Sequence, residues 1–78
     1  MYSYELKPTN GRKSFYGKAI VIVNNDESET LVSYGTPILT RFKDGTFTKH
    51  WNGWTDTTGK HIISFCGMHK KEFEALEM

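Results

Sequence analysis

The chain has 78 residues, enough for one small domain in which roughly 60–65% of the unfolded chain's surface becomes buried. A domain of this size leaves little room for a spacious catalytic cavity. Ten basic and nine acidic residues give a net charge of +1, so charge alone does not indicate a polyanionic or polycationic partner. Hydrophobic residues make up 37% of the chain and aromatic residues 14%, which excludes intrinsic disorder.

The first two thirds of the chain have strand character. Alternating or β-branched patterns predict strands at residues 2–7, 15–23, 30–34, 38–43 and 46–51. Asp44-Gly45 is the clearest hairpin signal, because this pair suits a tight turn between antiparallel strands. The stretch Gly35-Thr36-Pro37 is expected to bend or interrupt the strand at residues 30–34, since proline has no N–H to donate to a central ladder.

The pattern becomes helical after Trp54. Thr55 or Asp56 can accept hydrogen bonds from the free amides of a first helical turn, and Gly67 is expected to end this helix. Residues 70–76 predict a last, short helix.

These elements predict an α+β fold that forms a single domain over residues 1–78. A small antiparallel β-meander of four to five strands, within residues 1–54, packs against one or two C-terminal helices within residues 55–78. The expected core contributors are large residues on one face of each element: Tyr4, Leu6, Ile20, Ile22, Leu31, Ile38, Phe42, Ile62, Phe65 and Phe73.

The single cysteine, Cys66, cannot form an internal disulfide, whereas small secreted domains usually contain several. A buried thiol is favoured over a catalytic nucleophile. No apolar run approaches the length of a membrane span, and the first residues lack the pattern of a signal peptide. We therefore predict a cytoplasmic protein without membrane contact.

The predicted start of the first helix is a candidate binding site. Gly59-Lys60 is similar to part of a phosphate-binding loop, but such a loop needs an earlier glycine and a Ser or Thr directly after the lysine, where this chain has His61. We interpret the stretch as a helix N-cap, with simple anion binding near Lys60 as the alternative.

The three histidines do not predict a metal site, because the close ligand pairs typical of such sites are missing. His61 is expected to hydrogen bond an oxygen of Thr57 or Thr58, or to pack against Trp54. We predict no metal and no other cofactor. No serine, cysteine or histidine lies in a recognised nucleophile context, so we predict that the protein is not an enzyme; a hydrolase or nuclease would have to depend on His61.

A segment before the second predicted strand interleaves basic and aromatic residues, as in proteins that hold single-stranded nucleic acid by charge and stacking together. The candidates are Arg12, Lys13, Phe15, Tyr16 and Lys18. Exposed hairpin residues would extend this basic surface: Arg41, Lys43, Lys49 and His50. The same segment also fits a solvated turn followed by core rings.

Trp51 and Trp54 are candidates for a protein–protein interface, together with Tyr16 and Tyr34. Large rings are enriched where interfaces concentrate their binding energy. In a domain this small the same rings also suit the core, and only their exposure separates the two uses.

Three blocks carry a resemblance to a known family: RKSFYGKA at residues 12–19, LVSYGTPI at 31–38 and WTDTTGKHIISF at 54–65. In this order they resemble a family of small uncharacterised proteins from bacteriophages, plasmids and gut or Gram-positive bacteria. The resemblance implies a mobile-element origin. Because the family carries no assigned activity, it implies no catalytic or binding residue.

We therefore predict a non-catalytic interaction protein of phage or mobile-element origin that binds, and inhibits, an unidentified host or defence protein. The alternative is a small nucleic-acid-binding accessory protein that uses residues 12–18. A monomer or a homodimer is expected, located in the host cell cytoplasm if a phage encodes it.

Overall fold

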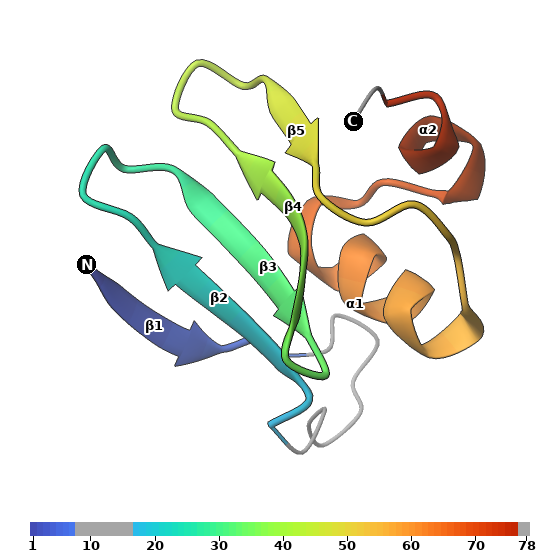
Figure 1. Ribbon diagram of the computed structural model, residues 1–78, viewed down its shortest axis with the longest axis horizontal. Helices are drawn as coiled ribbons and strands as arrows, with labels where there is room; N and C mark the ends of the chain where they lie inside the picture. The colour runs from blue at the N-terminus through green and yellow to red at the C-terminus, as the bar shows by residue number, and fades with distance from the viewer. Residues whose placement is uncertain (8–16, 77–78) are drawn as a thin grey trace.

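The fold is a five-stranded antiparallel sheet followed by two helices (Figure 1). The computed structural model describes residues 1–7 and 17–76. The strands pair in chain order and are β1 (Tyr2–Glu5), β2 (Ala19–Val23), β3 (Glu29–Ser33), β4 (Thr36–Arg41) and β5 (Phe47–Lys49). The helices are α1 (Asp56–Cys66) and α2 (Lys70–Glu74). The predicted α+β meander with two C-terminal helices is confirmed.

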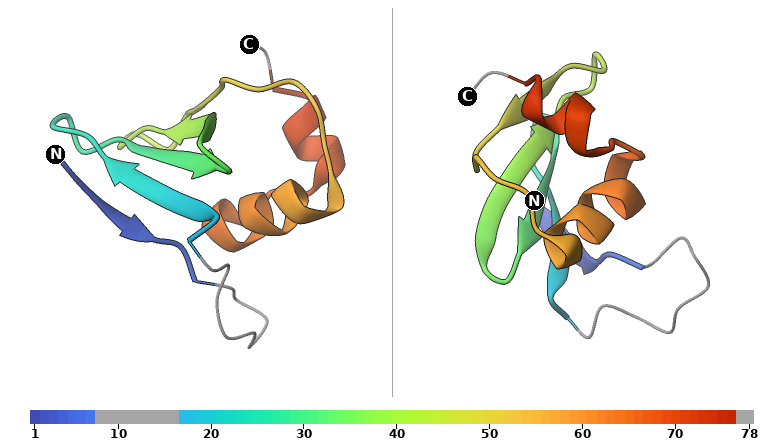
Figure 2. Two further views of the ribbon diagram at one scale, coloured as in Figure 1. Left: turned by 60° about the horizontal axis from the view of Figure 1, so that its bottom comes forward. Right: turned by 90° about the vertical axis from the view of Figure 1, so that its right-hand side faces the viewer.

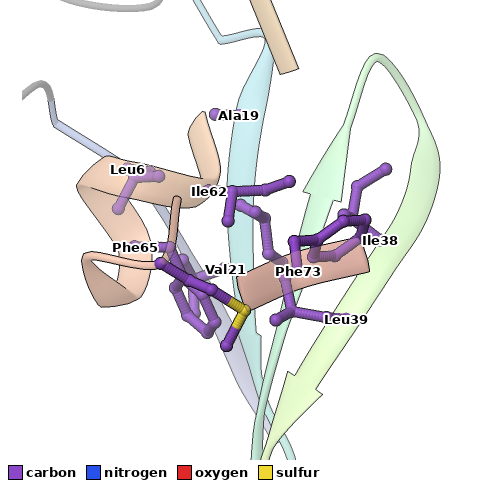
Figure 3. Close-up of a cluster of buried hydrophobic side chains, with 10 residues drawn as sticks. Leu6, Ala19, Val21, Ile38, Leu39, Ile62, Phe65 and Phe73 are labelled. Carbon is purple, nitrogen blue, oxygen red and sulfur yellow. The ribbon is translucent and has the colours of Figure 1, made fainter. Parts of the chain in front are cut away.

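Both helices lie on one face of the sheet, as the right-hand view of Figure 2 shows. Val21, Leu31 and Leu39 are cross-strand neighbours on this covered face and are fully buried. The core beneath the helices contains Leu6, Ala19, Val21, Leu31, Ile38, Leu39, Ile62, Phe65, Met68 and Phe73 (Figure 3). We call the opposite face, which neither helix covers, the open face.

The prediction that Ile20 and Ile22 of β2 point into the core is wrong. Ala19 and Val21 are buried, whereas Ile20 and Ile22 are half-buried on the open face. Successive strand residues point to opposite faces, so a shift of one residue exchanges the two sets. The apolar run AIVIV gives no polar residue by which the sequence can mark the outer face.

Tyr4 and Phe42, two further predicted core residues, are 43% and 36% exposed. Tyr4 lies on the edge strand β1, and Phe42 follows the last residue of β4. A large ring is buried only where another element covers it, and at both positions the sheet reaches its margin. Hydrophobicity alone therefore overestimates the size of the core.

Pro37 lies within β4 and does not end the sheet. The β3–β4 register shifts between Leu31 and Val32, so that Leu31 pairs with Leu39 and Val32 pairs with Pro37. The extra residue, Ile38, interrupts the alternation as a β-bulge does, and Ile38 and Leu39 are both buried. The bulge thus lets a strand that contains proline contribute two consecutive residues to the core.

The predicted Asp44-Gly45 hairpin is confirmed. Phe42 N–H donates to Thr46 O at 2.8 Å, and Gly45 adopts a φ of 90°. The Asp44 carboxylate accepts hydrogen bonds from the Thr46 backbone N–H at 3.0 Å and from the Thr46 hydroxyl at 2.7 Å. These bonds lower the pKa of Asp44, and the bond from the hydroxyl is the largest cause.

Helix α1 begins and ends at predicted residues. The Thr55 hydroxyl accepts from Thr58 N–H at 3.1 Å, and Gly67 adopts the left-handed conformation that ends the helix. Within its first turns, a Cβ at Gly59 would lie 2.6 Å from the Trp54 ring. Glycine is therefore needed there because the indole packs directly on the helix backbone.

Two cations of the sheet hold the C-terminal ends of the helices. The Arg41 guanidinium donates to Phe65 O in α1 at 3.2 Å and lies 4.5 Å from the Phe65 ring centroid. The Lys49 ammonium donates to Phe73 O in α2 at 3.3 Å and lies 5.2 Å from the Phe73 ring centroid. Cations are favourable at the negative end of a helix dipole. Lys49 is only 5% exposed, so its predicted place on a basic surface is wrong.

No helix within the described part of the chain is both long enough and apolar enough to cross a membrane.

Candidate functional site

The turn between β3 and β4 presents a tyrosine in a strained conformation. Tyr34 and Gly35 form a two-residue loop, since Ser33 pairs with Thr36, and their φ angles are 51° and 79°. This is the pattern of a type I′ hairpin, which favours Asn or Gly at the first position. A bulky residue held at positive φ costs about 1–3 kcal/mol. The chain therefore places a large ring where a small polar residue would be more stable.

Tyr34 is 57% exposed, and its ring has two neighbours from other parts of the chain. The Lys18 ammonium lies 5.7 Å from its centroid, and the His61 ring centroid lies 5.8 Å from it at an interplanar angle of 31°. The backbone is held as well, because Tyr34 N–H donates to Lys18 O at 2.8 Å. We call Lys18, Tyr34 and His61 the Tyr34 site.

His61 supports this site from inside the protein. It is 1% exposed, and its Nδ1 lies 2.8 Å from the hydroxyl of Ser33, the residue directly before Tyr34. The Ser33 hydroxyl is also 3.3 Å from that of Thr58, so α1 is bound to the end of β3. Burial lowers the pKa of His61, which favours the neutral ring at pH 7.

The His61 ring has a partner far away in the sequence. We expected Thr57, Thr58 or Trp54, all near in sequence, and the structure adds Ser33, 28 positions away. Thr58 contacts the same Ser33 hydroxyl. Local sequence reveals helix neighbours, whereas this bond depends on how α1 lies across the sheet.

A serine hydroxyl beside a histidine nitrogen is also the arrangement of an activated nucleophile. Here Ser33 is 2% exposed and His61 is buried with it, so both groups are shielded from solvent. At the other end of α1, burial raises the pKa of the Cys66 thiol, which disfavours the reactive thiolate.

The remaining predicted site residues lie outside the described part of the chain or are not part of the Tyr34 site. Arg12, Lys13, Phe15 and Tyr16 lie outside the described residues. Lys60 is exposed on α1.

The two tryptophans belong to the margin of the core. Trp51 and Trp54 are half-buried, with ring centroids 6.4 and 5.9 Å from that of Phe73. Their packing favours the structural use of these rings over an interface. In residues 1–7 and 17–76, no group of three His, Cys, Asp or Glu side chains is placed to bind a metal ion.

Sequence reasoning named Tyr34 only as one of several large rings and placed it inside a strand. The available signal was the dipeptide Tyr-Gly between two strand patterns at the spacing of a two-residue hairpin. A tyrosine is unusual at the first position of such a turn, so the bend was predicted one residue late, at Gly35-Thr36-Pro37.

Comparison with known proteins identifies a family without an assigned activity. The model of the family described as Family of unknown function (DUF8033) matches residues 4–77, and the chain belongs to this family. Comparison of the chain with curated proteins and with solved structures found no match.

Proposed function

We propose that this family member is a non-catalytic protein that binds a partner protein through the Tyr34 site. The observation that carries the proposal is the exposed Tyr34 ring, held on a strained turn. Tyrosine is among the residues that dominate binding energy at protein interfaces, and backbone strain concentrates at functional sites. The resemblance to phage and plasmid proteins suggests the kind of partner: a host or defence protein that is inhibited by stoichiometric binding.

The support around the ring suits this role. The backbone bond to Lys18 and the Ser33–His61 bond behind the turn limit the motion of Tyr34 before a partner arrives. A contact that is already ordered loses little conformational entropy on binding, so more of its interaction energy appears as affinity. Tyrosine adds a large contact area with few rotatable bonds.

The burial of the polar groups at the Tyr34 site also supports a binding role. The Ser33 and Thr58 hydroxyls and the His61 imidazole are buried and bonded to one another. The exposed features of the site are instead an aromatic face and the Lys18 ammonium, which suit recognition.

Tyr34→Asn tests the proposal without removing the turn. Asparagine suits the first position of a type I′ hairpin, so the free energy of unfolding should be at least as large as that of the wild type. The partner is first captured from host extract with the wild-type protein and identified, and its dissociation constant is then measured with purified components. We expect Tyr34→Asn to weaken binding at least about tenfold.

Phe42→Asn is the matched control, because Phe42 is also an exposed ring but lies outside the Tyr34 site. Its affinity should equal that of the wild type. A partner that binds the wild type and Tyr34→Asn equally well would contradict the assignment of the site, and a failure to capture any partner from relevant hosts would count against the function itself.

A second candidate, binding of single-stranded nucleic acid, is favoured by the Lys18 ammonium beside the exposed ring. It predicts that a labelled oligonucleotide binds with an affinity that falls steeply as salt rises, because each neutralised phosphate releases counterions. Replacing both Arg12 and Lys13 by alanine should then lower the affinity for the oligonucleotide below that of the wild type at the same salt concentration. Affinity that does not change in the double variant would exclude this candidate.

A further inference from the structure

The two edges of the sheet differ in how they are protected. Unpaired edge strands bind further strands unless they are short, covered or carry an inward-pointing charge. β5 has three residues, and its Lys49 points inward beneath α2. All four residues of β1 are exposed, and no described element lies beyond this strand (Figure 1).

The hydrogen bonds of β1 show which of its backbone groups have no partner among the described residues. Leu6 N–H donates to Ala19 O at 2.9 Å, so Leu6 and Ala19 form a hydrogen-bonded pair. Such pairs alternate along an antiparallel ladder, which directs the backbone groups of Tyr2 and Tyr4 toward β2. The N–H and C=O groups of Ser3 and Glu5 therefore point out from the free edge.

The side chains leave this edge accessible. The Tyr4 hydroxyl donates to Glu29 Oε2 at 3.3 Å on β3, so the ring leans inward across β2. Glu29 is itself held by Arg41, whose Nη2 lies 2.8 Å from Glu29 Oε1. The Glu5 carboxylate accepts Gly17 N–H at 3.1 Å. Neither side chain is free to fold over the outward amides.

We propose that β1 pairs with β1 of a second copy of this chain, in antiparallel orientation, to form a dimer with one continuous sheet. In this register Ser3 lies opposite Glu5 of the second copy, and each such pair exchanges two backbone hydrogen bonds. The two-fold axis passes between the Tyr4 residues. This arrangement does not depend on the Tyr34 site.

The register is self-complementary. Glu5 lies opposite a serine and not opposite another acid, so no like charges face each other directly, and Tyr2 lies opposite Leu6 of the second copy as an aromatic–aliphatic pair. The axis keeps the covered faces of both copies on the same side. A second copy thus satisfies the free backbone groups of both edges at once.

Sedimentation equilibrium of the full chain, from about 1 µM to about 1 mM, tests the proposal. We expect a monomer–dimer equilibrium. Ser3→Pro should raise the dimer dissociation constant at least about tenfold, because it removes an N–H that points outward and makes no bond to the residues that the structure describes. Ser3→Ala keeps that N–H and should dimerise like the wild type, and so should Tyr34→Asn.

Amide hydrogen exchange of the wild type gives a readout that holds even if Ser3→Pro does not fold. The amides of Ser3 and Glu5 should exchange more slowly as protein concentration rises. A monomer throughout the range, a dimer that Ser3→Pro does not weaken, or exchange that is independent of concentration would each overturn the proposal. A monomeric wild type whose captured partner is lost in Ser3→Pro would also overturn it, and would assign the edge to a partner's strand.

Discussion

Two histidine–hydroxyl pairs lie on opposite faces of the sheet. On the covered face, His61 Nδ1 is 2.8 Å from the Ser33 hydroxyl; on the open face, His50 Nε2 is 2.7 Å from the Thr40 hydroxyl. The bonds are nearly equal in length, but His61 is buried beneath a helix and His50 is exposed. The same kind of hydrogen bond is therefore found in a buried environment at His61 and in a solvent-exposed one at His50.

This difference decides what each pair contributes. An exposed group that loses its partner bonds to water, whereas a buried group left without a partner carries its full desolvation penalty. His61 also joins α1 to the strand that ends at Tyr34, while His50 joins only neighbouring strands. We therefore expect stability and the position of Tyr34 to depend on His61 and to be nearly independent of His50.

The largest effect is expected from His61→Ala. It removes a buried ring and leaves the Ser33 hydroxyl without that partner, which should lower the free energy of unfolding by about 2–4 kcal/mol. Urea denaturation followed by tryptophan fluorescence measures the loss. If His61→Ala and His50→Ala are equally stable, the distinction between the two faces is wrong.

The pH dependence of stability should also reflect the burial of His61, with a smaller change in the free energy of unfolding than His61→Ala causes. Burial lowers the pKa of His61 in the folded protein, so below about pH 6.5 the unfolded chain binds a proton that the folded chain does not yet bind. Stability should be complete above that pH and decline as pH falls toward the lower pKa of the folded state.

The urea midpoint measured between about pH 8 and about pH 5 tests this decline, because paired carboxylates such as Asp26 and Asp44 protonate only at lower pH. His61→Gln, which has no titrating group at this position, should show a flatter profile in this range. An identical decline in wild type and His61→Gln would assign the acid sensitivity to other groups.

The smallest effect is expected from His50→Ala, a loss of about 0.5–1 kcal/mol. Thr40 is 6% exposed but keeps its contact with the Thr30 hydroxyl at 2.8 Å, and His50 is itself exposed, so water can take the place of the imidazole. The same urea experiment measures it. A loss above about 2 kcal/mol would show that the open face is covered in solution, as binding of another molecule there would cause.

Several elements were predictable because their causes are local. Thr55 and Gly67 mark the ends of α1, and Asp44-Gly45 marks a hairpin, through chemistry that acts within a few residues. The alternation of β2 was not predictable, because apolar residues occupy both of its faces. The bulge at Ile38 was hidden for a similar reason, since it depends on the register of β3 against β4.

For the candidate site, composition and local pattern determined the class of fold, the order of the elements and the presence of a histidine near the start of α1. Only the packing of α1 on the sheet decided that His61 would be buried against Ser33 and that Tyr34 would be exposed beside it. The physical reason is sequence separation: a contact across 28 positions depends on strand register and helix placement, which no short stretch of residues specifies.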